Sequence, residues 1–174
     1  MKDYIKRDIE KIILKLTNEY PAILITGPRQ VGKTTMLKKL MEGTNRNYVS
    51  LDDLTQRALA KNDPAMFFQI HKPPILIDEV QYAPELFTYI KIMIDENRNP
   101  GDFWLTGSQI FKLMKGVQES LAGRVAILNL SSLSQNEIYN KLENTPFSTD
   151  LKVLAEKEKQ IPKADTMDIF RKDI

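Results

Sequence analysis

A glycine-rich segment that ends in lysine and threonine has the residue types and spacing that bind phosphate groups. Residues 27–34 match the pattern G-x-x-x-x-G-K-[S/T], and a second threonine follows. The glycines let successive backbone N–H groups face inward as an anion nest, which the N-terminus of a following helix completes. Lys33 brings a positive charge to the β- and γ-phosphates of a nucleotide, and Thr34 offers its hydroxyl to Mg²⁺. The predicted nucleotide-binding residues are Gly27, Pro28, Arg29, Gln30, Val31, Gly32, Lys33, Thr34 and Thr35.

A pair of carboxylates is the second candidate for chemistry. Asp78 and Glu79 directly follow the apolar run 75–77, and the C-terminal end of a buried strand is where open α/β sheets bind their ligands. We predict that Asp78 binds Mg²⁺ through water and that Glu79 is a general base or orients water for hydrolysis. Alone, such a pair is equally typical of the charges that begin a helix. The phosphate loop that precedes this pair, with one intervening strand, favours the catalytic interpretation.

Side chains near two later strands complete the candidate site. Thr106 and Ser108 end a strand pattern and are candidates for sensing the γ-phosphate or positioning water, although a serine there is also a common helix N-cap. Arg124 precedes the next strand pattern. It is a candidate for reaching a γ-phosphate on a neighbouring subunit, and the alternative is an ordinary surface ion pair. The predicted catalytic residues are Lys33, Glu79, Ser108 and Arg124, and the predicted metal ligands are Thr34 and Asp78.

The composition limits the other classes of chemistry. Lys and Arg number 25 against 23 Asp and Glu, and the net charge of +2 does not favour nucleic-acid binding. The absence of cysteine excludes disulfides and thiolate metal sites, and the single histidine, His71, argues against histidine-clustered metal sites. Since no apolar run is long enough to span a bilayer and the first residues do not resemble a secretory signal, we expect a cytoplasmic protein without a membrane partner.

The sequence also predicts the scaffold that must bring these residues together. Apolar runs of strand length alternate with apolar stripes of helical period, which predicts an α/β fold with a parallel, doubly wound sheet and right-handed crossovers. Ser134 and Glu137 have the spacing of a capping box at the start of the last helix. The predicted strands are 22–27, 48–51, 75–78, 103–106 and 124–130, and the predicted helices are 5–16, 33–41, 53–60, 64–70, 84–94, 110–121 and 134–142.

The pattern changes after residue 143. Residues 144–174 carry as many basic as acidic side chains, few large apolar residues and no strand pattern. We therefore assign residues 1–143 to one domain. Residues 144–174 are expected to be a helical lid, the beginning of a further domain or a partly disordered end.

Five segments form one linked series: 27–35 (GPRQVGKTT), 51–53 (LDD), 77–81 (IDEVQ), 105–109 (LTGSQ) and 120–125 (SLAGRV). Together they resemble the bacterial and archaeal proteins described as predicted ATPases of the AAA superfamily. The resemblance runs from about Tyr4 to Ile138, and the series is far more specific than the phosphate loop alone.

The resemblance implies a P-loop NTPase core, built as a three-layer αβα sandwich whose five-stranded parallel sheet has the order 5-1-4-3-2. It implies ATP and Mg²⁺ as ligands. In this sequence the family's phosphate and Mg²⁺ ligands correspond to Lys33 and Thr34, its metal-binding and catalytic acids to Asp78 and Glu79, its sensor to Ser108 and its arginine finger to Arg124.

Members of this family usually continue into a second domain, whereas this sequence ends at Ile174, so we expect a truncated lid. The leading hypothesis is an AAA-type ATPase module that hydrolyses ATP with Mg²⁺. The alternatives are a nucleotide-gated binding module with little turnover and a phosphotransferase for a small acceptor. Besides ATP, we expect an unidentified protein partner and, if Arg124 acts in trans, further copies of the chain. A nucleic-acid partner has no support from the charge.

Overall fold

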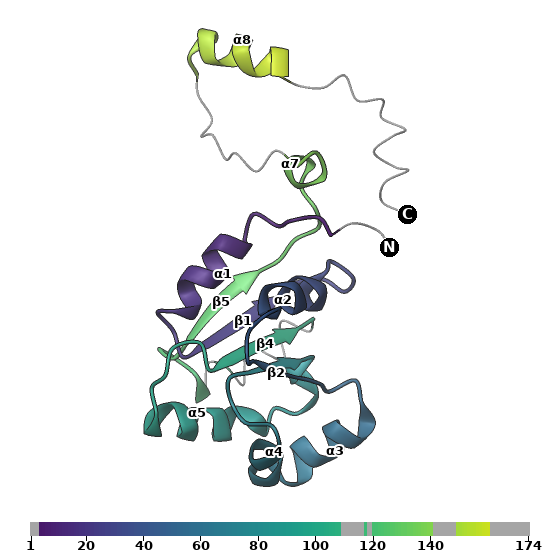
Figure 1. Cartoon of the computed structure of the whole chain (residues 1–174), viewed down its shortest axis with the longest axis vertical. Helices are drawn as coiled ribbons and strands as arrows, with labels where there is room; N and C mark the ends of the chain where they lie inside the picture. Colours follow the sequence, from purple (N-terminus) through teal and green to yellow (C-terminus); the bar gives the residue numbers. More distant parts are fainter. Residues whose placement is uncertain (1–3, 109–116, 118–119, 141–148, 161–174) are drawn as a thin grey trace. The chain divides into compact units, whose positions relative to one another are not determined.

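The computed structural model describes residues 4–108, 117, 120–140 and 149–160 (Figure 1). The chain divides into two compact units, Met1–Leu142 and Glu143–Ile174. The described element of the second unit is helix α8 (Leu151–Gln160), and what residues 144–174 do stays a prediction. No helix within the described ranges is long and apolar enough to cross a membrane.

Five parallel strands form the sheet of the first unit. They are β1 (Ala22–Thr26), β2 (Asn47–Ser50), β3 (Ile75–Asp78), β4 (Phe103–Gly107) and β5 (Val125–Asn129). Their order across the sheet is β2-β3-β4-β1-β5, which confirms the expected order 5-1-4-3-2. The strands β1, β3 and β4 are buried along their whole length, as parallel strands covered on both faces must be.

Helices cover both faces of this sheet. They are α1 (Glu10–Thr17), α2 (Lys33–Met41), α3 (Leu54–Asn62), α4 (Pro64–Ile70) and α5 (Leu86–Glu96), with the 3₁₀ helix η1 (Val80–Tyr82). The short helix α7 (Gln135–Ile138) follows β5 beyond the end of the sheet (Figure 1). Because successive strand side chains point to opposite faces, Leu24 and Leu105 pack with residues of α3, α4 and α5. Ile25 and Trp104 pack with residues of α1 and α2 on the other face. The three-layer sandwich is confirmed, with the strands between the two sets of helices (Figure 1).

The first helix begins later than its apolar spacing indicated. A period that includes Ile5 predicted residues 5–16, but α1 starts at Glu10 and Ile5 is 36% exposed. The Glu10 carboxylate accepts hydrogen bonds from the Arg7 amide (2.6 Å) and the Tyr4 hydroxyl (2.7 Å). These bonds hold the preceding residues in a turn, which is why the helix does not extend back to Ile5.

The predicted capping box at the start of α7 is confirmed. Ser134 Oγ accepts a hydrogen bond from the Glu137 amide at 3.2 Å, and Glu137 Oε2 accepts one from the Ser134 amide at 2.7 Å. The helix is shorter than predicted because Asn140, two residues beyond its end, adopts the left-handed conformation that terminates helices (φ 54°). The helix predicted over 110–121 lies for its greater part outside the described residues.

A buried ion pair joins the segment before α1 to α7. Arg7 Nε lies 3.0 Å from Glu137 Oε1, and both side chains are 6% exposed. Burial opposes ionisation of Glu137, but hydrogen bonds from the Ser134 and Asp8 amides and from Arg7 outweigh it. The pKa of Glu137 therefore lies below its ordinary value. Since a buried charge without its partner is strongly destabilising, the pair holds these distant segments together.

Glu137→Gln is expected to lower the free energy of unfolding by about 3–5 kcal/mol at neutral pH, because it leaves the Arg7 guanidinium buried without a counter-charge. The stability that Glu137 contributes is complete above the ordinary glutamate pKa and is lost as the pH falls through its lowered pKa in the folded protein. Urea unfolding at neutral and acidic pH measures both effects. The exposed Glu96→Gln is the matched control, and equal stability of the two variants at neutral pH would contradict the prediction.

Candidate functional site at the carboxyl edge of the sheet

The phosphate loop connects β1 to α2 and begins at a glycine that nothing larger can replace. A Cβ atom on Gly27 would lie 2.2 Å from the Leu130 carbonyl oxygen, and its φ of +144° is one that side chains rarely allow. Gln30 (φ 63°) and Gly32 (φ 88°) also have positive φ, so the chain curls tightly before α2. No side chain in the described ranges caps the N-terminus of α2, which leaves its N–H groups available to an anion.

The Lys33 ammonium lies against this loop. Its Nζ donates hydrogen bonds to the Gly27 carbonyl at 3.0 Å and the Pro28 carbonyl at 2.7 Å. Burial lowers the pKa of Lys33; Glu79 and Asp78 oppose this shift, and Arg29 adds to it. The lysine therefore carries its charge at a cost that a bound anion would reduce.

The carboxylate of Asp78 gathers three hydroxyl groups. Thr34 Oγ1 donates to Asp78 Oδ1 at 2.7 Å, and Thr106 Oγ1 donates to the same oxygen. Tyr48 contacts Asp78 Oδ2 through its hydroxyl at 3.4 Å. The residue is only 6% exposed, so these bonds fix the orientation of the carboxylate. The contact between Thr34 and Asp78 brings together the two predicted metal ligands.

Glu79 turns away from the strand that carries Asp78. Its backbone is left-handed (φ 57°), an uncommon conformation for such a residue and one that concentrates at functional sites. Its Oε2 accepts hydrogen bonds from Ser108 Oγ at 3.0 Å and from the Gln81 side-chain amide. The Gln81 Oε1 is buried without a hydrogen-bond partner in the described part of the chain. The two predicted catalytic side chains Glu79 and Ser108 are thus in direct contact.

Thr106 links the two acidic residues. While its hydroxyl donates to Asp78, it accepts a hydrogen bond from the Glu79 amide at 3.1 Å, and the residue is fully buried. The register of the sheet explains this, since Ile77 pairs with Leu105 and the following residues lie side by side. Thr106 therefore orients Asp78 and Glu79, whereas Ser108 contacts the Glu79 carboxylate itself.

The donor set of this edge fits Mg²⁺. One carboxylate, from Asp78, stands beside the Thr34 hydroxyl, and Mg²⁺ is typically bound by one or two carboxylates together with substrate phosphates. In the described ranges no three histidine, cysteine or acidic residues cluster as they do in an all-protein metal site. Such a site would depend on phosphate oxygens to complete the coordination.

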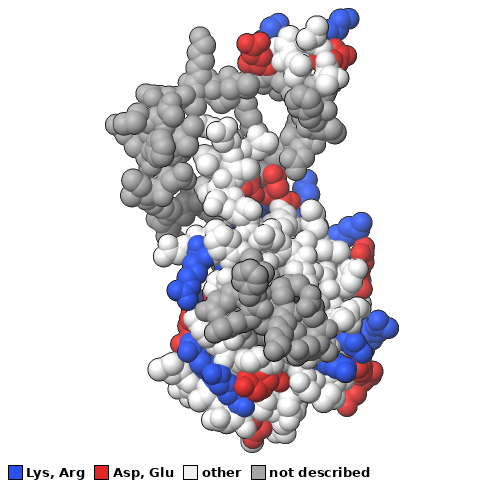
Figure 2. Space-filling view, turned by 180° about the vertical axis from the view of Figure 1, so that it is seen from behind, with Lys and Arg blue, Asp and Glu red and all other residues white. Residues whose placement is uncertain are grey.

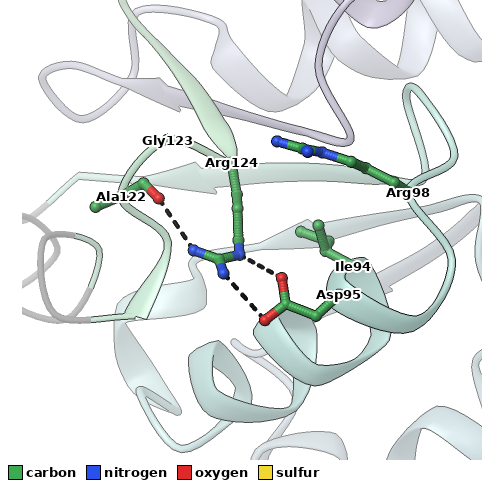
Figure 3. A pocket seen from close by; sticks show the side chains of 6 residues that line it. All are labelled: Ile94, Asp95, Arg98, Ala122, Gly123 and Arg124. Atoms are coloured by element: carbon green, nitrogen blue, oxygen red, sulfur yellow. Dashed lines mark hydrogen bonds and ion pairs between the residues drawn. The ribbon is translucent and has the colours of Figure 1, made fainter.

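Arg124 lies at the amino edge of the sheet, where the strands begin, opposite the carboxyl edge that carries the phosphate loop. It precedes β5, whose first residue pairs with Ala22 at the start of β1, while the phosphate loop follows the end of β1, about 16 Å away at 3.3 Å per residue. Its guanidinium forms a two-pronged ion pair with Asp95, at 2.7 and 3.0 Å. The pair lies in a pocket of about 260 Å³. Figure 3 shows that the Arg98 side chain lies beside Arg124 without joining the ion pair. The structure does not bring Arg124 to the phosphate loop of its own chain.

On the face that Figure 2 shows, the charged side chains of the described residues do not form a basic patch for a polyanion. On the face in Figure 2, basic and acidic side chains of the described residues are interspersed. This agrees with the net charge of +2.

The sequence patterns missed three residues that shape this edge. Gln81 and Tyr48 contact Glu79 and Asp78, and Arg7 donates to the Val31 carbonyl of the loop at 2.9 Å. Gln81 stands within a segment that the family resemblance had marked. Nothing in the local sequence around Tyr48 or Arg7 indicated a part in the site.

A phosphate loop after β1 and an acidic pair at the end of β3, in a parallel sheet of this order, define the protein as a P-loop NTPase. The model of the AAA domain family matches residues 19–139. The chain belongs to this family, as the resemblance of its motifs implied.

Two curated relatives, uncharacterized proteins of Mycobacterium bovis and Mycobacterium tuberculosis, are each 32% identical over 138 residues, or 76% of this chain. The chain spans 30% of their length. Among solved structures, the Walker-type ATPase of Pyrococcus abyssi matches with a TM-score of 0.57 and 17% identity, over 78% of this chain and 56% of that one. The Thermotoga maritima RuvB Holliday junction branch migration motor matches with a TM-score of 0.51 and 20% identity, over 79% of this chain and 49% of that one. At these identities the structures support the fold.

Thr106→Val is expected to lower the free energy of unfolding by about 1–3 kcal/mol, because it leaves the buried Glu79 amide and one Asp78 oxygen each without a partner. Urea denaturation measures this. Thr106→Ser keeps the hydroxyl and is the matched control. If Thr106→Val and Thr106→Ser have the same free energy of unfolding, Thr106 does not link the two acidic residues through its hydroxyl.

Proposed function

We propose that this chain binds ATP with Mg²⁺ at the carboxyl edge of its sheet and hydrolyses it. The observation that carries the proposal is the meeting of three groups at this edge. They are the phosphate loop with Lys33, the Thr34–Asp78 pair, and the Glu79–Ser108 pair. Family membership supports nucleotide binding, and the side-chain contacts support the assignment of roles.

The phosphate loop binds the β- and γ-phosphates through its backbone N–H groups and the N-terminus of α2. Lys33 exchanges the Gly27 and Pro28 carbonyls for phosphate oxygens, which provide a better partner for its buried charge. Thr34 and Asp78 would hold Mg²⁺, which would supply positive charge to neutralise the β- and γ-phosphates. The exposed side chains of Pro28, Arg29 and Gln30 leave this loop open to solvent.

Glu79 accepts a proton from the attacking water as the water oxygen bonds to the γ-phosphorus. The bond from that phosphorus to the β–γ bridging oxygen breaks, and its electron pair stays on ADP. The proton passes on to the released phosphate. Ser108 and Gln81 hold the Glu79 carboxylate before the reaction, and Ser108 is the group placed to sense whether a γ-phosphate is present.

A nucleotide-gated binding module with little turnover is the second candidate. The position of Arg124 favours this candidate for a single chain. Arg124 is paired with Asp95 at the amino edge of the sheet and so does not contribute to the phosphate site of its own chain. Its proposed role as an arginine finger therefore requires a second copy, whose Arg124 reaches the γ-phosphate bound by the first. In that case turnover rises with assembly, whereas nucleotide binding does not depend on it.

Glu79→Gln is expected to lower Mg²⁺-dependent phosphate release from ATP by about 10²–10⁴-fold while the affinity for ATP stays close to wild type. The amide keeps the size of the side chain but cannot accept the proton of water. Phosphate release and equilibrium ATP binding measure the two effects, with the exposed Glu85→Gln as control. If wild type binds ATP and releases no phosphate at any protein concentration, the gated-module alternative replaces hydrolysis.

Arg124→Ala is expected to reduce phosphate release by about 10³-fold or more in the assembled protein, and Arg98→Ala from the same pocket is the control. Mixing the inactive Arg124→Ala and Glu79→Gln variants provides the sharper measurement. Activity returns on mixing if Arg124 acts in trans, because an intact Glu79 on one chain then meets an intact Arg124 on the other. Full activity of Arg124→Ala alone would instead make Arg124 a surface ion-pair residue.

A further inference from the structure

The buried guanidinium of Arg7 connects three segments that are distant in the sequence. Besides its ion pair with Glu137, its Nη1 donates to the Val31 carbonyl at 2.9 Å, and its Nη2 donates to the Ser131 carbonyl at 2.7 Å and the Ser132 carbonyl at 3.3 Å. The residue is 5% exposed. Arg7 thus ties the phosphate loop to the connection between β5 and α7.

The bond to Val31 fixes one peptide unit of the phosphate loop. In a trans peptide the carbonyl and the following N–H point in opposite directions. Because the Val31 carbonyl faces Arg7, the Gly32 N–H points away from Arg7. That is the direction this N–H needs if the loop binds a phosphate on its other side. Gly32 itself lies close to the guanidinium, since a Cβ there would be 4.0 Å from Arg7 Nη1.

We propose that Arg7 is a positioning residue of the phosphate loop, which holds the Val31–Gly32 peptide so that the Gly32 N–H is presented to the nucleotide phosphates. The inference rests on the proposed nucleotide function and adds a residue from outside its motifs. Arg7 reaches no phosphate itself, because its guanidinium lies on the carbonyl side of this peptide.

The shape of the guanidinium makes arginine necessary here. Its planar fork lets Nε bind Glu137 while Nη1 and Nη2 bind the Val31 and Ser131 carbonyls. A lysine ammonium is a compact charge with rotatable donors and cannot reproduce this fixed arrangement. Arg7→Lys therefore keeps the charge opposite Glu137 but releases the Val31–Gly32 peptide.

Arg7→Lys is expected to weaken the binding of ADP and of ATP with Mg²⁺ by about tenfold, because a misaligned N–H loses a hydrogen bond to a charged oxygen. The KM for ATP should rise by a similar factor while kcat stays near wild type, since Glu79 and Ser108 are untouched. Ile90→Ala, a buried substitution in α5 on the other face of the sheet, is the control that lowers stability at a distance from the loop. Where Arg7→Lys does not fold, Glu137→Asp, which keeps both charges and shifts the guanidinium, should give a smaller rise in KM.

Glycine-selective ¹⁵N labelling supplies a readout that needs no nucleotide. The chain has 7 glycines, and the Gly32 amide signal should shift in Arg7→Lys but not in Ile90→Ala. Wild-type affinity for ADP in Arg7→Lys, or an unchanged Gly32 signal, would show that Arg7 only stabilises the fold and would overturn the inference. If wild type bound neither ADP nor ATP, the proposed function would fail, and the Gly32 signal would still decide whether Arg7 holds the loop.

Discussion

The parallel alignment of the strands is the constraint on which the rest of the structure depends. Because β1, β3 and β4 run in one direction, the phosphate loop, the acidic pair and Ser108 leave the sheet at the same edge. The close approach of Gly27 to the Leu130 carbonyl, where no Cβ fits, then fixes the path of the loop past the end of β5. An antiparallel strand at any of these positions would place its functional side chain at the opposite edge.

The charged groups at this edge have partners within the chain that an anionic ligand and a cation could replace. Burial depresses the pKa of Lys33, and the ammonium binds carbonyl groups, which are weaker partners than phosphate oxygens. On the other side, Asp78 and Glu79 occupy their carboxylate oxygens with hydroxyl and amide donors from this chain. We infer that a nucleotide with a divalent cation would replace both sets of contacts at once, which couples binding to the release of Glu79 and Lys33.

The sequence was sufficient for what depends on local pattern, and insufficient for what depends on distant contacts. Strand order followed from the family resemblance. Motif chemistry marked Asp78 and Thr34, which the structure brings into contact. The predicted start of α1 was wrong because Arg7 and Glu10 form a turn that apolar periodicity cannot detect. Arg7 itself was missed because its partner Glu137 is 130 residues away. Because Arg124 precedes a parallel strand, its location at the amino edge of the sheet can be inferred from the sequence. Its ion pair with Asp95 cannot be inferred in that way.

Equilibrium binding of ATP with Mg²⁺ to wild type and Lys33→Ala tests the central claim most directly. Lys39, an exposed lysine of the same helix that pairs with Glu42, provides the matched control as Lys39→Ala. We expect one nucleotide per chain for wild type and Lys39→Ala, and an affinity lower by at least about tenfold for Lys33→Ala. Equal affinity of Lys33→Ala and wild type, or no binding by wild type, would contradict it.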